Sequence, residues 1–316
     1  MHPAYSVIVF TTASGAGYGL LIWLAIAARL QLVERDPLFG FVAIGLSLML
    51  VTIGLLSSTL HLGRPERAWR SFSQWRTSWL SREGIAALAT YVPAGALGWA
   101  WVFGELMPGQ FALGAALSVP CALITVWCTG MIYASLPTIR AWHQPLVGPV
   151  YLALALGSGG LLFVLITAAF QIESRWATVT TLLLLTLGAS LKTRYWRAID
   201  TEPKTHTAEA ATGLGALGTV RPLDPPHTQP NFVMREMGFQ VARRHGMKLR
   251  GLTMLLLFIV PIAAMALLVL DMPGWLRIAI AALATLSATA GVLTERWLFF
   301  AQAEHVVMLY YRGGTA

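Results

Sequence analysis

Residues 61–83, HLGRPERAWRSFSQWRTSWLSRE, separate two long apolar runs at 38–60 and 84–103. The stretch holds five arginines, three tryptophans, one histidine and two glutamates. Apolar runs of about 18 residues or more are typical of membrane-spanning helices. The sequence therefore predicts two spanning helices joined by a polar loop at the membrane surface.

The composition of the whole chain agrees with this interpretation. Of its 316 residues, 56% are hydrophobic and only 11% are charged. A soluble domain carries roughly a quarter charged residues, so this chain has too few charges to cover a water-facing surface. We expect an all-α polytopic membrane protein that forms a single domain over 1–316. The first apolar segment lacks a basic n-region and is expected to stay in the mature chain.

Eight segments approach the roughly 20 residues that a membrane-spanning helix needs. They cover approximately 5–28, 38–60, 84–103, 111–136, 146–170, 177–196, 251–270 and 275–298. A long extramembrane segment, 197–250, separates the sixth from the seventh. The sixth is the least apolar, and its Lys192 and Arg194 are expected to snorkel towards the membrane surface.

Positive charge is distributed unevenly between the two membrane faces that eight spans would define. Of the 22 lysines and arginines, the four on one face are Arg29, Arg35, Arg175 and Arg277, and the others share the opposite face with both termini. All seven histidines fall on this second face. The positive-inside rule therefore predicts both termini and the 61–83 loop in the cytoplasm.

Several cofactor and function classes lack their usual residues. No histidine lies near the middle of a predicted span, and there are only two cysteines, so we expect neither haem nor an iron–sulfur cluster in this chain. Basic repeats of the kind that bind nucleic acid are absent, and the basic loops are expected to contact membrane lipids. Arg277, Glu295 and Arg296 are placed near span ends, so we expect no ionisable residues buried within the spans. This argues against ion-coupled transport but leaves open a carrier of a neutral solute.

The ends of the 61–83 loop form the first candidate site. His61 closes the second span, Glu83 opens the third, and Arg64 and Arg67 follow His61. Hydrogen-bonding groups beside an apolar groove suit a quinone, whose ring oxygens need partners and whose redox change needs a proton exchanger. The alternative is that these arginines and the nearby tryptophans only anchor helices at the interface.

The second candidate region is the stretch 231–250, NFVMREMGFQVARRHGMKLR. Apolar residues alternate there with basic ones in a pattern that favours an amphipathic helix on the membrane surface or against a partner protein. A solvated basic linker is the alternative. The residues expected to dock a partner are Arg235, Glu236, Arg243, Arg244 and His245.

The 61–83 loop also resembles a known family. Its pattern HLG-x-P-x-R-A followed by LS-x-E, from His61 to Glu83, is similar to the loop of the membrane-anchor subunits of dimethyl sulfoxide reductase, the DmsC family. The opening HPAYSVIVFTTASGAGYGLL, the segment FVMREMGFQVARRH and the ending ERWLFFAQAEHVVMLYY resemble a branch of this family. The resemblance covers most of the chain.

The resemblance implies a role in electron transfer. An anchor of this family binds menaquinone or ubiquinone and docks an iron–sulfur subunit with [4Fe-4S] clusters, which connects it to a catalytic subunit with molybdenum bis-pterin. His61 and Glu83 match family positions implicated in quinol binding, and a related branch anchors sulfite dehydrogenase. The implied location is the bacterial cytoplasmic membrane. The alternatives are a purely structural anchor without its own quinone site and a neutral-solute carrier.

Overall fold

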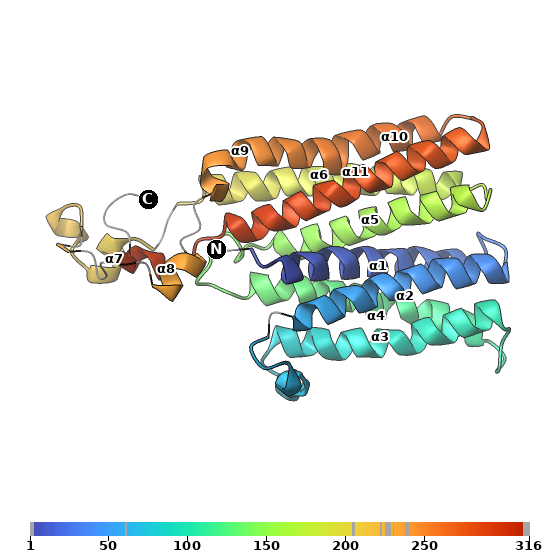
Figure 1. Ribbon diagram of the computed structural model, residues 1–316, viewed down its shortest axis with the longest axis horizontal. Coiled ribbons are helices and arrows are strands. Elements are labelled where there is room, and N and C mark those ends of the chain that lie inside the picture. The colour runs from blue at the N-terminus through green and yellow to red at the C-terminus, as the bar shows by residue number, and fades with distance from the viewer. Residues whose placement is uncertain are drawn as a thin grey trace.

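A computed structural model describes residues 3–60, 62–203, 206–221, 223–224, 229, 231–237 and 241–311. Within these residues, long helices lie side by side and form an elongated bundle (Figure 1). They are α1 (Tyr5–Arg29), α2 (Pro37–Thr59), α3 (Trp79–Val102), α4 (Gln110–Ala134), α5 (Val147–Ala169), α6 (Arg175–Thr201), α9 (Val241–Thr253), α10 (Val260–Leu268) and α11 (Gly274–Ala301). The predicted all-α architecture is confirmed for the described part of the chain.

Short elements gather at one end of the bundle, beside the start of α1 (Figure 1). They are the 3-10 helices η1 (Pro65–Gln74) and η2 (Gly215–Leu217), and the helices α7 (Ala208–Thr212), α8 (Phe232–Met237) and α12 (Met308–Tyr311). We call this end, with residues 62–78, 135–146 and 303–311 and the described residues of 202–245, the basic end. It is the face to which the sequence assigned most of the positive charge.

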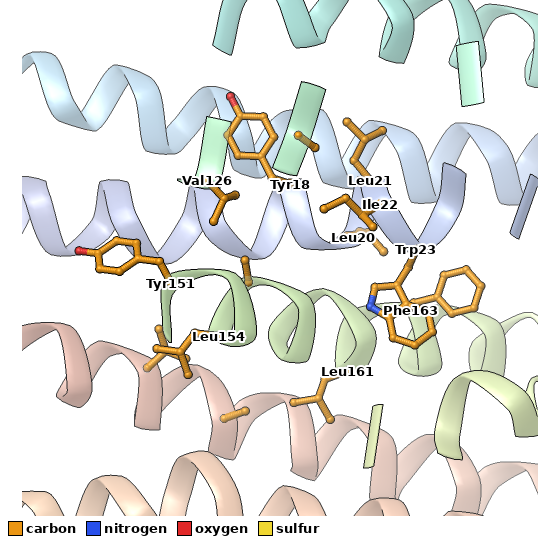
Figure 2. Close-up of a cluster of buried hydrophobic side chains, with 14 of the residues drawn as sticks. Tyr18, Leu20, Leu21, Ile22, Trp23, Val126, Tyr151, Leu154, Leu161 and Phe163 are labelled. Carbon is orange, nitrogen blue, oxygen red and sulfur yellow. The ribbon is translucent and has the colours of Figure 1, made fainter. Parts of the chain in front are cut away.

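Helix α1 lies in the middle of the bundle between α2, α4, α5 and α11. Its side chains Leu20, Leu21 and Leu24 are fully buried, and the indole of Trp23 donates a 2.9 Å hydrogen bond to the carbonyl of Leu156. Figure 2 shows Leu20, Leu21 and Trp23 within this buried cluster. Small residues permit this packing, because a Cβ atom built on Gly19 would overlap the backbone of α5. Such close approach is the usual way in which helices associate in lipid.

Two helices begin at caps that the local sequence provides. The side chain of Asp36 accepts a 2.6 Å hydrogen bond from the Phe39 amide, with Pro37 in the first turn of α2. The side chain of Ser78 accepts from the Ser81 amide at 3.5 Å and marks the start of α3. Both satisfy backbone donors that a helix start leaves free. As a result α3 begins inside the stretch expected to be a loop and contains Glu83.

Seven helices of the described chain are long and apolar enough to cross a membrane. They are α1 to α5, the helix that runs from α9 through α10, and α11. Helix α6 has 27 residues and lies alongside α5 and α10, but its composition is less apolar than that of the seven. The chain is therefore a multi-pass membrane protein.

The helix that enters α10 begins earlier than the apolar run at 251–270. Helix α9 begins at Val241 and continues through a π-helical segment, η3 (Met254–Ile259), directly into α10. The second half of the 231–250 stretch is thus the first part of a bundle helix, whereas its first half contains the separate helix α8. A π-helical segment of this kind adds a residue to a helical turn and often marks a functional position.

Charged side chains are buried within the long helices, and here the expectation was wrong. Lys192 in α6 and Glu295 and Arg296 in α11 are all almost completely shielded from solvent. Lys192 does not snorkel, because its ammonium group forms an ion pair with Glu295. Arg277 also differs from a simple surface charge, since its Nε atom is buried and makes no hydrogen bond within the described residues.

Candidate functional site

The middle of the 61–83 stretch lies on the outside of the bundle. His61 lies outside the described residues. The 3-10 helix η1 exposes Trp69 and is followed by the exposed Trp75, and each has a guanidinium over its ring: that of Arg70 at 5.6 Å and that of Arg76 at 5.4 Å. Exposed pairs of this type are typical of a membrane–water interface, where aromatic rings and cations meet lipid headgroups.

Hydrogen bonds attach this outer segment to the start of α3. The guanidinium of Arg82 donates to the carbonyls of Trp75 and Arg76 at 2.9 and 2.7 Å. The Ser81 hydroxyl donates to the carbonyl of Ser71. Arg82 therefore has a structural role at the turn that precedes Glu83.

Glu83 faces the interior of the bundle. In α3 the buried positions include Glu83, Ala87, Thr90 and Ala94, a spacing of three or four residues that defines one helix face. This face packs against α4, and the Glu83 side chain is only 4% exposed. The Thr129 hydroxyl on α4 donates a 2.8 Å hydrogen bond to Oε1 of Glu83.

The surroundings of Glu83 are neutral. Within the described residues it forms no ion pair. Tyr133 lies one helical turn after Thr129 on α4, and Tyr18 is on α1, which also packs against α4. The Tyr18 hydroxyl is buried and makes no hydrogen bond to any described residue. A carboxyl in such surroundings is expensive to keep as an anion, so it is well placed to exchange a proton.

The four residues of the predicted quinone site are not all at one place. Arg64 and Arg67 are exposed in or next to η1, and the nearest acid to Arg67 is Glu66, at 4.0 Å from Nε to Oε1. In the described part of the chain, neither arginine forms a hydrogen bond or an ion pair with Glu83. The structure thus separates an inner acid from outer cations.

Sequence reasoning missed the groups around Glu83. Thr129 and Tyr133 lie in an apolar run, and a threonine in such a run usually bonds to its own helix, as Thr129 also does to the Thr125 carbonyl at 3.0 Å. Tyr18 lies 65 positions before Glu83 in the sequence, and no local pattern connects the two. The weak signal available was the pair of threonines four positions apart in α4, at Thr125 and Thr129.

A separate apolar groove of about 220 Å³ lies between long helices of the bundle, and Glu83 does not line it. It is bounded by α1, α2, α5 and α11, and its walls include Val9, Ala13, Leu50, Leu162 and Val292. Its polar atoms include the Thr12 hydroxyl oxygen, which is buried without a hydrogen bond to any described residue. These walls suit a hydrocarbon tail.

The side chains of the predicted docking segment are mostly outside the described set. Those of Arg235, Glu236, Arg243 and Arg244 are not described, whereas His245 is exposed in α9. The backbone places these residues in α8 and at the start of α9, at the basic end (Figure 1). Nearby, the side-chain amide of Asn231 donates a 3.2 Å hydrogen bond to the Tyr311 hydroxyl.

Metal ligands do not cluster among the described side chains. No group of three or more histidine, cysteine, aspartate or glutamate residues in that set could hold a metal ion. Cys121 and Cys128 are both free thiols in α4.

Comparison with known proteins gives the family. The model of the "DMSO reductase anchor subunit (DmsC)" family matches residues 1–301. A sulfite dehydrogenase subunit of Allochromatium vinosum is 33% identical over 335 aligned positions, which cover 99% of both proteins. A subunit of the anaerobic dimethyl sulfoxide reductase of Escherichia coli is 32% identical over 97 positions, 30% of this chain and 33% of that protein. YnfH, another E. coli protein of anaerobic dimethyl sulfoxide reductase, is 27% identical over 53% of this chain and 59% of its own length. The resemblance to the DmsC family that the 61–83 loop indicates is thus confirmed over residues 1–301. The chain belongs to the DmsC family of membrane-anchor subunits.

Proposed function

We propose that this chain is the membrane-anchor and quinone-binding subunit of a molybdenum bis-pterin oxidoreductase complex. It exchanges electrons between the quinone pool, menaquinone or ubiquinone, and an iron–sulfur subunit. The observation that carries the quinone site is the Glu83 carboxyl group, which is buried among neutral side chains in the first turns of α3 with one hydroxyl donor, Thr129. The similarity over nearly the full length to a sulfite dehydrogenase subunit supports the role in a complex.

Glu83 provides the proton chemistry of the proposed site. A quinone gains two protons and two electrons when it becomes a quinol, so it needs a group that can donate or accept a proton beside a ring oxygen. Thr129 fixes the orientation of Oε1, which leaves Oε2 for the ring oxygen or hydroxyl. His61 remains a proposed hydrogen bonder and proton exchanger, and Arg64 and Arg67 are proposed to orient the headgroup as it enters from the surface.

The proposed direction of electron flow follows the better-matched relative. A sulfite dehydrogenase passes electrons towards quinone, whereas a dimethyl sulfoxide reductase takes them from quinol. Similarity covers 99% of this chain for the sulfite dehydrogenase subunit and 30% for the first of the two reductase proteins. We therefore favour quinone reduction in this complex. The sulfur substrate is handled by the partner with molybdenum bis-pterin.

Partner docking is proposed for the basic end. Arg235, Glu236, Arg243, Arg244 and His245 belong to α8 and the start of α9, beside the other short elements of that end. With these charges in the cytoplasm, the complex would sit on the cytoplasmic face of the bacterial inner membrane. Charge reversal at Arg243 and Arg244 together is expected to release the iron–sulfur subunit during purification. Retention of all partner subunits in the purified complex would rule out this docking surface.

Helix α6 is proposed as the eighth spanning helix. It has the length of its neighbours and lies between α5 and α10. Lys192 contributes to its lower hydropathy, and this charge is paired inside the bundle instead of facing lipid. Cysteine labelling from either side of the membrane, at the two ends of α6, would test whether the ends are on opposite faces.

The central experiment uses the complex purified with its partner subunits. We expect Glu83→Gln to lower quinone-coupled turnover by tenfold or more and to leave turnover with an artificial dye unchanged, because the dye bypasses the membrane subunit. Glu173→Gln is the matched control, an exposed acid away from the proposed site. If Glu83→Gln keeps the wild-type quinone rate, the quinone site is elsewhere. If, in addition, a quinone-site inhibitor does not bind the complex, the chain is a structural anchor.

A further inference from the structure

The cluster of buried charges at Lys192, Glu295 and Arg296 lies outside the proposed quinone site. The Lys192 ammonium donates a hydrogen bond to Oε1 of Glu295, and Nε of Arg296 lies 3.5 Å from Oε2 of the same carboxylate. The side chains are 2%, 0% and 2% exposed, respectively. Ionisable residues at such depth are expensive and usually have a function in the transport of charge.

Two features separate this cluster from a simple ion pair. It contains two cations and one anion, so it has a net positive charge inside an apolar bundle. In addition, Oε2 of Glu295 and Nη1 of Arg296 are buried and form no hydrogen bond with the described residues. A purely structural clamp gains most when all its polar atoms are bonded. This cluster keeps polar atoms free.

One side of the cluster leads to the aqueous face. Asp200, whose side chain is 53% exposed, pairs with Arg250 at 2.5 Å. The Arg250 guanidinium lies 5.4 Å from the ring of Trp196, and the Lys192 ammonium lies 5.0 Å from the same ring. Tyr195 also faces Lys192, with its ring centre 4.3 Å from Nζ. Charged groups thus extend from solvent at the end of α6 to the buried lysine.

The other side of the cluster leads towards Glu83. The Arg296 guanidinium lies 3.7 Å from the ring centre of Tyr151, and the Tyr151 ring stacks on Tyr133 with 6.0 Å between centres. The Tyr151 hydroxyl is buried and makes no hydrogen bond to a described residue, and Tyr133 lies one helical turn after Thr129, the residue that bonds to Glu83. Tyrosine hydroxyls can accept one proton while they donate another. Two side chains that carry hydroxyl groups, Tyr151 and Tyr133, therefore lie between Arg296 on α11 and the turn of α4 that contacts Glu83.

We propose that Lys192 is a buried proton-exchange residue that connects Glu83 to the aqueous face at Asp200, with Glu295 and Arg296 as its positioning residues. This inference rests on the proposed quinone chemistry. Arg296 stays protonated under all conditions of interest and holds Glu295 as an anion. Glu295 in turn positions the Lys192 ammonium. In this arrangement lysine is the member of the cluster that can lose and regain a proton.

Quinone reduction at this site consumes two electrons and two protons. The iron–sulfur partner supplies the electrons, and a proton moves from the Glu83 carboxyl group to a ring oxygen, where an O–H bond forms. The resulting carboxylate regains a proton through the hydroxyls of Tyr133 and Tyr151 as one N–H bond of Lys192 breaks. The neutral amine is then protonated from the aqueous side. The second proton of the quinol arrives by a repeat of these transfers, and quinol oxidation runs them in reverse.

Lys192→Arg tests the proposal most directly. Arginine preserves the positive charge and the pairing with Glu295, but it does not release its proton. In the purified complex we expect quinone-coupled turnover to fall at least tenfold, with dye-linked turnover and the affinity for a quinone-site inhibitor unchanged. The remaining turnover is expected to show a larger slowing in deuterated water than the wild type does. Lys248→Arg, at an exposed lysine of α9, is the matched control.

A double variant separates a loss of proton exchange from a loss of folding. Lys192→Met with Glu295→Gln removes one charge of each sign, so the net charge of the cluster is unchanged, and the amide oxygen stays beside the Arg296 guanidinium. We expect the same loss of quinone turnover with dye-linked turnover retained. Wild-type quinone turnover in Lys192→Arg, or loss of dye-linked turnover in both variants, would make the cluster a structural clamp and overturn the inference. If Glu83→Gln is impaired while Lys192→Arg is not, the quinone site stands and only this inference fails.

Discussion

Glu83 and Glu295 are both buried acids near the basic end of the bundle, but their surroundings are opposite. Glu83 has a neutral hydroxyl donor, Thr129, and no ion pair within the described part of the protein. Glu295 lies between the cations Lys192 and Arg296. An acid without a cation tends towards the neutral form, whereas an acid between two cations is held as an anion. The first is suited to proton exchange with a ligand, and the second to fixing the position of a charge.

The comparison predicts the largest effect on stability at Glu295. Glu295→Leu leaves Lys192 and Arg296 buried without their anion, and breaking a buried pair in this way costs about 3–5 kcal/mol. We expect failure of assembly or a strong drop in the unfolding temperature of the complex in detergent. Glu295→Gln is the milder companion, because its amide oxygen still accepts a hydrogen bond. A stable complex with Glu295→Leu would contradict the assignment of Glu295 as the partner of both cations.

The matching change at Glu83 should leave the fold nearly intact. Glu83→Leu removes a carboxyl whose described partner is one neutral hydroxyl, which leaves Thr129 bonded to the Thr125 carbonyl. Replacing such a group by an apolar one is close to neutral for stability, within about 1–2 kcal/mol. We expect wild-type amounts of assembled complex with little quinone-coupled turnover. A fall in stability as large as that of Glu295→Leu would contradict the inference that Glu83, unlike Glu295, has no cationic partner.

The contrast also explains what the sequence alone could and could not predict. Helices α1, α2 and α5 begin and end within a residue or two of the apolar runs, because an uninterrupted run already specifies a buried or lipid-facing helix. From the sequence, Glu295 and Arg296 are predicted to lie near a span end, since a charge in an apolar run usually marks one. Their partner Lys192 lies 103 positions from Glu295, and no local periodicity connects residues at that separation.

The candidate site was predictable to a similar extent. Glu83 was identified from the loop motif, but its direction was not, because the Ser78 cap starts α3 before Glu83 and turns the acid into the α3–α4 interface. Arg64 and Arg67 were grouped with it on proximity in the sequence, and the structure leaves them outside. The buried faces of two helices had to be known before Thr129, Tyr18 and Tyr133 could be placed beside the acid.

Thr129→Val is expected to have a smaller effect on quinone turnover, and it tests whether Thr129 orients Glu83. The valine keeps the shape of the side chain but removes the 2.8 Å hydrogen bond to Oε1. A lost hydrogen bond to a buried group costs about 1–3 kcal/mol, so we expect severalfold weaker quinone turnover and a modest loss of stability. Thr129→Ser should restore both, since its hydroxyl can donate in the same place. Equal rates for the valine and serine variants would show that Thr129 does not orient Glu83.

The smallest effect on stability is expected at the exposed end of the charged row. Asp200→Asn removes the pair with Arg250, but the Asp200 side chain is half exposed and the Arg250 guanidinium also bonds to the side chain of Gln302 at 3.3 Å. Exposed pairs contribute about 0–1 kcal/mol, so the unfolding temperature should hardly change. Denaturation of the complex at low and high salt would check this, because a surface pair is screened and a buried one is not. A loss comparable to that of Glu295→Leu would mean that the buried cluster extends to Asp200, and that the aqueous boundary lies farther out than its exposure indicates.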